Sequence, residues 1–301
     1  MAANLRHAPF RPPMLSPAPT RTLATDDADA LSRLVRLLRF RTTVFFSGRL
    51  CGDADYEQPD IPAQFHFVLE GRLAVRDLRT GQTRDVDAPG FIAFPTPNPH
   101  RIFATEPAGC RLLCCYVLPA DSVSAGLIRA LPNPLAIDLR SHPVLSALGA
   151  LLSAEAAHAR PGRDECVQLH LKAVVMEAVR LALAEGRVSA GVLPVLSDAR
   201  LARAVAAFLE RPGAHWTIAA LARAAGMSRS AFAATFAKVA GTTPQQFLSA
   251  VRYDLGSRLL AEGVPMKAVA RAVGYASSSS FARSMRHSRA KPVAVFPPSD
   301  P

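Results

Sequence analysis

Apolar side chains recur at helical spacing in short segments along the last third of the chain, and glycine or proline separates these segments. Residues that can cap a helix N-terminus precede most of them, namely Asp198, Thr217, Ser228, Thr243 and Ser277. We therefore predict helices at residues 199–210, 218–225, 229–240 and 244–262. A further helix should lie between Pro265 and Gly274, and a last one should follow Ser277.

Two stretches of this region, 219–238 and 266–286, share one arrangement of a short helix, a glycine turn and a second helix. The first has its defining positions at Leu221, Ala222, Gly226, Phe232 and Phe236. The second has them at Val269, Ala270, Gly274, Phe281 and Met285, with one extra residue after the glycine. Because this arrangement places a recognition helix in the DNA major groove, the pattern predicts two tandem DNA-binding units.

Residues 42–118 show a different pattern, in which short β-rich runs alternate with turns that contain Gly, Pro, Asp and Thr. The runs are TTVFFSGRL, QFHFVLEG, RLAVRDL, FIAFP, HRIFA and RLLCCYVL. Many short strands at close spacing favour an antiparallel β-sandwich or small barrel. Around it we expect helices at 29–39, 142–158 and 165–185, followed by a linker at 186–194.

Length and composition restrict the class of protein. A chain of 301 residues should hold about two domains, and half of its residues are hydrophobic, which allows sizeable cores. No apolar run approaches the ~18–20 residues of a membrane span. The N-terminal segment contains five prolines and no continuous apolar core, so we expect a disordered tail rather than a signal peptide. The five cysteines include no CxxC pair, which favours a reduced cytosol.

Positive charge is concentrated in the last third of the chain. The whole sequence has 35 Lys+Arg against 24 Asp+Glu, a net charge of +11. Residues 198–296 alone hold 14 Lys/Arg and four Asp/Glu. Such a segment attracts phosphate backbones, although charge by itself is equally compatible with a solvated basic face. Combined with the tandem helical motif, the charge favours nucleic acid as the partner.

The stretch WTIAALARAAGMSRSAFAATFAKVAGTTPQQFLSAVRYDLGSRLLAEG, followed by VARAVGYASSSSFARSM, resembles the DNA-binding domain of AraC/XylS-type transcription regulators. Upstream, FHFVLEG and APGFIAFPTPNPH resemble the cupin-type sensor domain of one branch of these regulators. The resemblance implies an N-terminal antiparallel β-sandwich or barrel with flanking helices. It also implies a C-terminal all-α domain of two helix-turn-helix lobes joined by a long helix.

The expected domain boundaries follow from these segments. We expect a disordered tail at 1–28, a cupin-like sensor domain at 29–120 and a helical dimerisation or linker region at 121–194. The DNA-binding domain should occupy 195–296, and a short tail 297–301. The chain departs from the family near its end, where Met285 replaces a common Phe and Arg289-Ala290 stands in for an aromatic–Gly pair. The second lobe is therefore expected to be loosely packed.

The resemblance assigns DNA-reading roles position by position. In the first unit, base-reading positions hold Ser230, Ala233 and Ala234, and alanine can contact only a thymine methyl group. In the second unit, the outward residues are Ser278, Ser279 and Arg283. Arg283 matches the position suited to a bidentate guanine contact, while a phosphate contact is the equally weighted alternative. The candidates for phosphate contacts are Arg229, Lys238 and Arg286.

The β-rich domain offers a candidate pocket. Alternate residues of a strand share a face, so His66, Val68 and Glu70 should point one way, opposite to Phe65 and Phe67. Similarity to cupin enzymes implies that His66, Glu70 and His100 form an effector or metal pocket, with Val68 in the place of a second histidine. Three ligands can hold a metal with open positions. We favour the alternative that His66 is a barrel histidine bonded to Glu70, with a small-molecule effector in the barrel.

Three functional hypotheses remain. The first is a sequence-specific DNA-binding transcription regulator whose cupin-like domain binds an effector and whose helices at 142–158 and 165–185 help to dimerise or relay the signal. The alternative is a metal-dependent cupin enzyme with an appended helical domain, and the third is a basic interaction protein without sequence preference. No nucleophile elbow, Gly-rich phosphate loop or zincin motif occurs. We therefore predict a cytoplasmic regulator of double-stranded DNA that is not an enzyme, with no cofactor, no membrane association, an unknown small-molecule effector and a homodimer left open.

Overall fold

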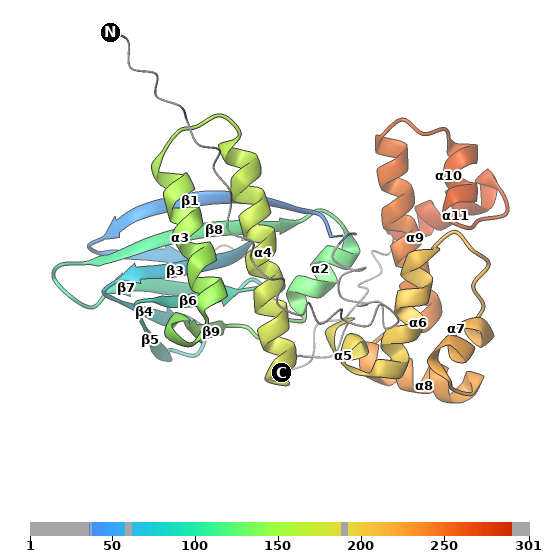
Figure 1. Ribbon diagram of the computed structural model, residues 1–301, viewed down its shortest axis with the longest axis horizontal. Coiled ribbons are helices and arrows are strands. Elements are labelled where there is room, and N and C mark those ends of the chain that lie inside the picture. The colour runs from blue at the N-terminus through green and yellow to red at the C-terminus, as the bar shows by residue number, and fades with distance from the viewer. Residues whose placement is uncertain (1–35, 37, 58–61, 188–191, 291–301) are drawn as a thin grey trace, which may run out of the picture.

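The computed structural model describes residue 36 and residues 38–57, 62–187 and 192–290. These residues form a β-rich N-terminal part and a helical C-terminal part that lie side by side (Figure 1), which confirms the predicted fold class. Nearly all of the helix expected at 29–39 and both expected tails lie outside the described residues. Among the described residues, no helix is long and apolar enough to span a membrane.

Nine strands form two antiparallel sheets in the described part of the chain. The five-stranded sheet has the order β1 (Phe40–Leu50), β8 (Cys110–Pro119), β3 (Ala63–Glu70), β6 (Gly90–Phe94) and β9 (Leu135–Asp138). The four-stranded sheet has the order β2 (Asp53–Tyr56), β7 (His100–Ala104), β4 (Arg72–Asp77) and β5 (Thr83–Asp87). Six of these strands match predicted runs, whereas β2, β5 and β9 were not predicted.

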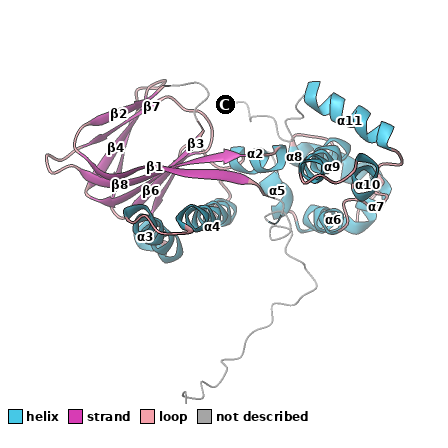
Figure 2. Ribbon diagram, turned by 90° about the horizontal axis from the view of Figure 1, so that it is seen from above, coloured by secondary structure: helices cyan, strands magenta, loops and turns pink. Residues whose placement is uncertain are grey.

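The alternation along β3 separates two hydrophobic cores. Phe65 and Phe67 belong to a core that continues under α3 (Pro143–Ala157) and α4 (Arg163–Ala184), the two helices that cover the outer face of the five-stranded sheet (Figure 2). Val68 faces the other way, into a second core between the two sheets. The predicted facing is therefore confirmed for Phe65, Phe67 and Val68.

Seven helices form the described C-terminal part: α5 (Val192–Ser197), α6 (Ala199–Glu210), α7 (Ile218–Ala225), α8 (Arg229–Ala240), α9 (Pro244–Ala261), α10 (Met266–Ala272) and α11 (Ser278–Ala290). Their starts confirm the predicted caps. The side chains of Asp198, Thr217, Ser228 and Thr243 each accept a hydrogen bond from a backbone N–H of the first turn. Thr243 and Gln246 add a reciprocal capping box at the start of α9.

Two helices differ from the prediction. Val192 to Pro194 were expected in a linker, but they open α5, whose Leu193 and Val195 are buried in the core shared with α6 and α8. Pro194 is compatible with the helix because it lies in the first turn, where its missing N–H costs no hydrogen bond. The short helix α2 (Ser122–Arg129) was not predicted, and it lies between the β-sheets and the helical part (Figure 1).

Candidate DNA-binding surface and sensor interior

The first helix-turn-helix unit consists of α7, the turn at Gly226 and α8. Gly226 adopts φ of +66°, a left-handed conformation that favours glycine and ends α7. Ser228 then starts α8 by accepting a hydrogen bond from the Ala231 N–H at 3.2 Å. Phe232 and Phe236 are buried against the core. The opposite face of α8 therefore points outward, as predicted.

The predicted DNA-reading residues of α8 lie on that outward face. Ser230 and Ala234 are exposed, and Ala233 is half-buried. Arg229 and Lys238, at the two ends of the helix, are also exposed. The structure thus brings the predicted base-reading and phosphate positions of the first unit together on one surface, with small side chains in its middle.

The second unit consists of α10, the turn at Gly274 and α11. The Ser277 hydroxyl accepts a hydrogen bond from the Ser280 N–H at 3.1 Å and starts α11. Phe281 is fully buried in a separate small core with Val269, Ala270 and Val273, and Met285 packs partly buried against it. This lobe was expected to be loosely packed. Instead its core is closed, because Gly256 of α9 leaves room for the Phe281 ring, which lies 2.5 Å from where a Cβ would stand.

The outward face of α11 carries polar and positive side chains. Ser279, Arg283 and Arg286 are exposed and Ser278 is half-buried. Ser280, which the sequence did not single out, donates from its hydroxyl to the Ser277 carbonyl at 2.8 Å and so serves the helix start. Consequently the predicted residues of the second unit also share one surface.

The helices of the two units carry no acidic side chains. Helices α7, α8, α10 and α11 contain no Asp or Glu. Within the described ranges, no ion pair engages Arg229, Lys238, Arg283 or Arg286. Two of the four acidic residues at 198–296 are paired elsewhere, Asp198 with Arg200 at 3.1 Å and Glu262 with Arg258 at 3.8 Å. The recognition helices therefore present cations that are available to phosphates and base edges.

The interior between the two sheets contains a pair of buried histidines. The His66 and His100 rings lie 5.9 Å apart between centroids and are surrounded by Phe45, Tyr56 and Phe94. The His100 Nδ1–H donates to the Asn98 carbonyl at 2.7 Å, and the His66 Nε2–H donates to the Gln64 amide oxygen at 3.2 Å. Each bond fixes the proton on one ring nitrogen, which leaves the other nitrogen as an acceptor.

Within the described part of the chain, these buried polar atoms are left without a hydrogen-bond partner. His66 Nδ1, His100 Nε2 and the amide nitrogen of Gln64 are buried and find no hydrogen-bond partner among the described residues. A buried polar group without a partner costs roughly 1–3 kcal/mol, so three in one cluster need a physical explanation. The interior is chemically suited to a small polar molecule that donates hydrogen bonds to the two imidazole nitrogens and accepts one from the Gln64 amide.

Glu70 does not join these histidines. The pairing of β3 with β8 is irregular between Val68 and Glu70, and beyond it the Glu70 carboxylate binds Arg49 at 2.8 Å and Arg111 at 2.9 Å at the surface. The expected bond between His66 and Glu70 is therefore absent. Across the described ranges, no group of three His, Cys, Asp or Glu side chains could hold a metal ion. The residues present do not fit the three-ligand metal site that similarity to cupin enzymes implied.

Burial controls the protonation of the histidine pair. Burial lowers the pKa of His66 to about 3, with a smaller contribution from the nearby His100. Burial also lowers the pKa of His100, against opposing effects of the Asn98 carbonyl and Asp77. Because an unfolded histidine binds protons near pH 6.5, the unfolded state gains protons first as the pH falls. The free energy of unfolding should therefore be higher at neutral pH than in acid, where protonation of these two histidines favours the unfolded state.

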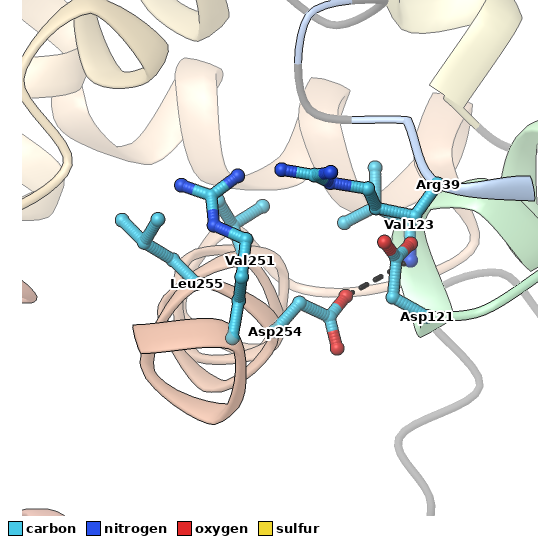
Figure 3. A pocket seen from close by; sticks show the side chains of 7 residues that line it. Arg39, Asp121, Val123, Val251, Asp254 and Leu255 are labelled. Carbon is cyan, nitrogen blue, oxygen red and sulfur yellow. Dashed lines mark hydrogen bonds between the residues drawn. The ribbon is translucent and has the colours of Figure 1, made fainter. Parts of the chain in front are cut away.

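A polar junction connects the two parts of the protein. Asp121 caps α2 by accepting from the Ser124 N–H at 2.7 Å, and Asp254 of α9 accepts from the Val123 N–H at 3.1 Å (Figure 3). Arg39 and Arg258 line the small pocket beside these acids. Sequence reasoning missed this junction, since Val123 and Asp254 are 131 residues apart and only the folded chain brings them together.

Comparison with known proteins identifies the class. Residues 29–184 match the Cupin family, and residues 221–294 match the family described as Helix-turn-helix domain. The chain belongs to the AraC-type DNA-binding transcription regulators with an N-terminal cupin domain. Its similar proteins are transcription regulators and not enzymes.

Two of these relatives align over most of their length. The RCS-specific HTH-type transcriptional activator RclR of Escherichia coli (strain K12) is 28% identical over 263 residues, which cover 84% of this chain and 91% of that protein. The HTH-type transcriptional regulator AlkR of Acinetobacter baylyi is 25% identical and covers 73% of this chain and 83% of its own. The structure of ToxT from Vibrio cholerae is 14% identical, covers 82% and 93% of the two chains, and has a TM-score of 0.34.

Proposed function

We propose that this protein reads one specific two-part DNA sequence, with α8 in one major groove and α11 in the next. The observation that carries the proposal is the pair of outward helix faces that combine cations with small polar or apolar side chains and contain no acidic group. Buried Phe232 and Phe236 lie behind the face of α8 and buried Phe281 behind that of α11, so the exposed side chains are presented on rigid elements.

The two helices would read different bases. In α8, Ser230, Ala233 and Ala234 would lie against base edges, where the alanines can contact thymine methyl groups. In α11, Ser278 and Ser279 would approach bases, and Arg283 would bond the O6 and N7 atoms of a guanine. Arg229, Lys238 and Arg286 would hold phosphates and set the register without contributing sequence information. An operator with a thymine-containing half and a guanine-containing half is the expected target.

We further propose that the sensor domain binds a small polar effector between its sheets. The support is the cluster of unpartnered Gln64, His66 and His100 atoms inside an aromatic enclosure. A guest with hydrogen-bond donors would satisfy both imidazole acceptors. Native mass spectrometry of the purified protein, beside its His66→Phe variant, tests this: a bound molecule or ion lost in the variant would support the proposal. Equal spectra for both proteins would contradict it.

The effector signal would leave the sensor through α2 and reach α9 at the Val123–Asp254 hydrogen bond. The helices at 142–158 and 165–185 offer a second route, because α4 covers the outer face of the sheet and also contacts α5.

Helices α3 and α4 also carry large exposed apolar side chains, Val144 (57% exposed), Leu151 (49%) and Leu169 (66%). We propose that a second copy of the chain packs there, which sedimentation of the protein and of Leu169→Glu would test. Loss of dimers in the variant is expected, and a wild-type monomer would contradict the proposal.

This proposal divides the chain into a sensor at 29–120, a dimerisation and linker region at 121–191 and a DNA-binding domain at 192–296 that opens with α5, acting in the cytoplasm. Titration of the full-length protein against a duplex that it selects from a random pool, and against a scrambled duplex, tests the function. A preference that persists when salt is raised is expected, because base contacts do not depend on counterion release. Equal binding to both duplexes would refute sequence-specific recognition.

A further inference from the structure

The two helix-turn-helix lobes touch each other directly, backbone against backbone. The contact joins the loop between α6 and α7, which contains Gly213, to the end of α10 and its turn at Gly274. A Cβ at Gly213 would stand 2.1 Å from the Ala272 carbonyl oxygen. A Cβ at Gly274 would stand 2.8 Å from the Gly213 carbonyl oxygen. Since no side chain fits at either position, glycine is what permits the lobes to approach this closely.

Arg252 of α9 donates two hydrogen bonds to the same loop. Its Nε donates to the Pro212 carbonyl at 3.0 Å and its Nη2 donates to the Ala214 carbonyl at 2.8 Å. The guanidinium carbon lies 5.9 Å from the centre of the Phe208 ring of α6. The site of a Cβ on Gly274 is 3.0 Å from Nη2, so the guanidinium also borders the second lobe.

The chemistry of Arg252 suits a structural clamp better than a DNA contact. The side chain is half-buried, and burial lowers its pKa while the neighbouring Tyr275 opposes that shift. Its hydrogen bonds go to two carbonyls that no helix ladder uses. A planar guanidinium can donate in two fixed directions at once, which the single ammonium of lysine does not reproduce.

We propose that Arg252 is a positioning residue that locks the two lobes together and thereby fixes the spacing between the two DNA half-sites. The inference rests on the proposed roles of α8 and α11 as the two reading helices. A rigid connection converts binding of the second lobe into an intramolecular step, but only when both half-sites match the fixed geometry. One inserted base pair rotates a half-site by roughly 34° and moves it by about 3.4 Å, which a locked pair of lobes cannot follow.

The test uses the full-length protein and a duplex of about 30 base pairs that it selects from a random pool. Footprinting on that duplex locates the two protected half-sites. Affinity is then measured for duplexes in which one, two or five base pairs are inserted between the half-sites. The variant is Arg252→Lys, which retains the charge and hence the general attraction to phosphates. Arg200→Lys is the matched control, because Arg200 is an exposed residue of α6 that pairs with Asp198 away from the contact between the lobes.

Wild type and Arg200→Lys should lose at least about tenfold in affinity on one insertion. Arg252→Lys should bind the original duplex about tenfold more weakly, yet lose less than about threefold on the insertion, because its lobes move independently. Gly213→Ala should behave in the same way, since its Cβ forces the loop away from Ala272. Gly213→Ala therefore tests the same contact if circular dichroism shows that Arg252→Lys is not folded.

Several results would overturn the inference. If wild type protects both half-sites and tolerates insertions, the lobes are not locked. If both Arg252→Lys and Gly213→Ala keep the wild-type sensitivity to spacing, the contact is not the lock. One further result would contradict the proposed function itself. If the protein selects and protects only one half-site, α8 and α11 do not both read DNA, and there is no spacing between half-sites for Arg252 to fix.

Discussion

Replacing Arg283 by alanine isolates the guanine contact expected of α11. The side chain is exposed, and no ion pair holds it among the described residues, so its removal should leave the fold unchanged. A bidentate arginine–guanine pair contributes roughly 1–3 kcal/mol, which corresponds to a loss of about 5- to 150-fold in affinity for the cognate duplex. On a scrambled duplex the loss should be much smaller.

The assay is a fluorescence anisotropy titration at several salt concentrations. A base contact changes the affinity at one base pair, so Arg283→Ala should bind all four variants of that pair nearly equally while its salt slope stays close to wild type. Arg286→Ala is the matched comparison on the same helix. Because Arg286 is expected to contact a phosphate, Arg286→Ala should bind every duplex more weakly and have a salt slope smaller by about 0.9.

The base-reading assignment fails if Arg283→Ala weakens cognate and scrambled duplexes by the same factor and reduces the salt slope. Arg283 would then contact a phosphate, and α11 would contribute position without sequence information. Arg271→Ala provides the background for both variants, because Arg271 is an exposed arginine of α10 outside the recognition helix.

Three further changes probe the rest of the structure. Between about pH 6 and about pH 3, wild type should lose up to about 1.4 kcal/mol of unfolding free energy per pH unit through His66, whose pKa burial lowers to about 3. His66→Phe should flatten that dependence in urea titrations, and parallel curves for the two proteins would contradict it. Asp254→Ala should lower stability by about 1–2 kcal/mol in thermal unfolding, because the Val123 N–H loses its acceptor, and an unchanged melting temperature would argue against the junction. Gly256→Val should cost about 1–3 kcal/mol by crowding Phe281, whereas unaltered stability would show that the second core can yield.

Local chemistry made the helical part predictable from the sequence. Each recognition helix starts at a serine that caps its own first turn, Ser228 or Ser277, and each preceding helix ends at a glycine turn. All of these signals lie within a few residues of the element that they define. The outward faces followed from the buried phenylalanines, because a helix that buries one side must expose the other.

Pairing across the chain explains what was missed. The strands β2 (DADY) and β5 (TRDVD) are short and largely exposed, so they carry little apolar pattern. Glu70 continues the alternation of β3 in the sequence, but after an irregularity in the pairing its carboxylate binds Arg111 of β8 and Arg49 of β1 at the surface. The Asp254 contact with α2 and the Arg252 contact with the loop at 212–214 join segments that no local pattern relates.

The measurement that tests the central claim most directly is selection of bound duplexes from a random pool by the full-length protein at two salt concentrations. We expect one recurrent motif at both salts, with a thymine-containing half and a guanine-containing half about one helical turn apart. No enriched motif, together with binding that disappears at the higher salt, would contradict the account. The two helices would then hold phosphates alone, without reading sequence.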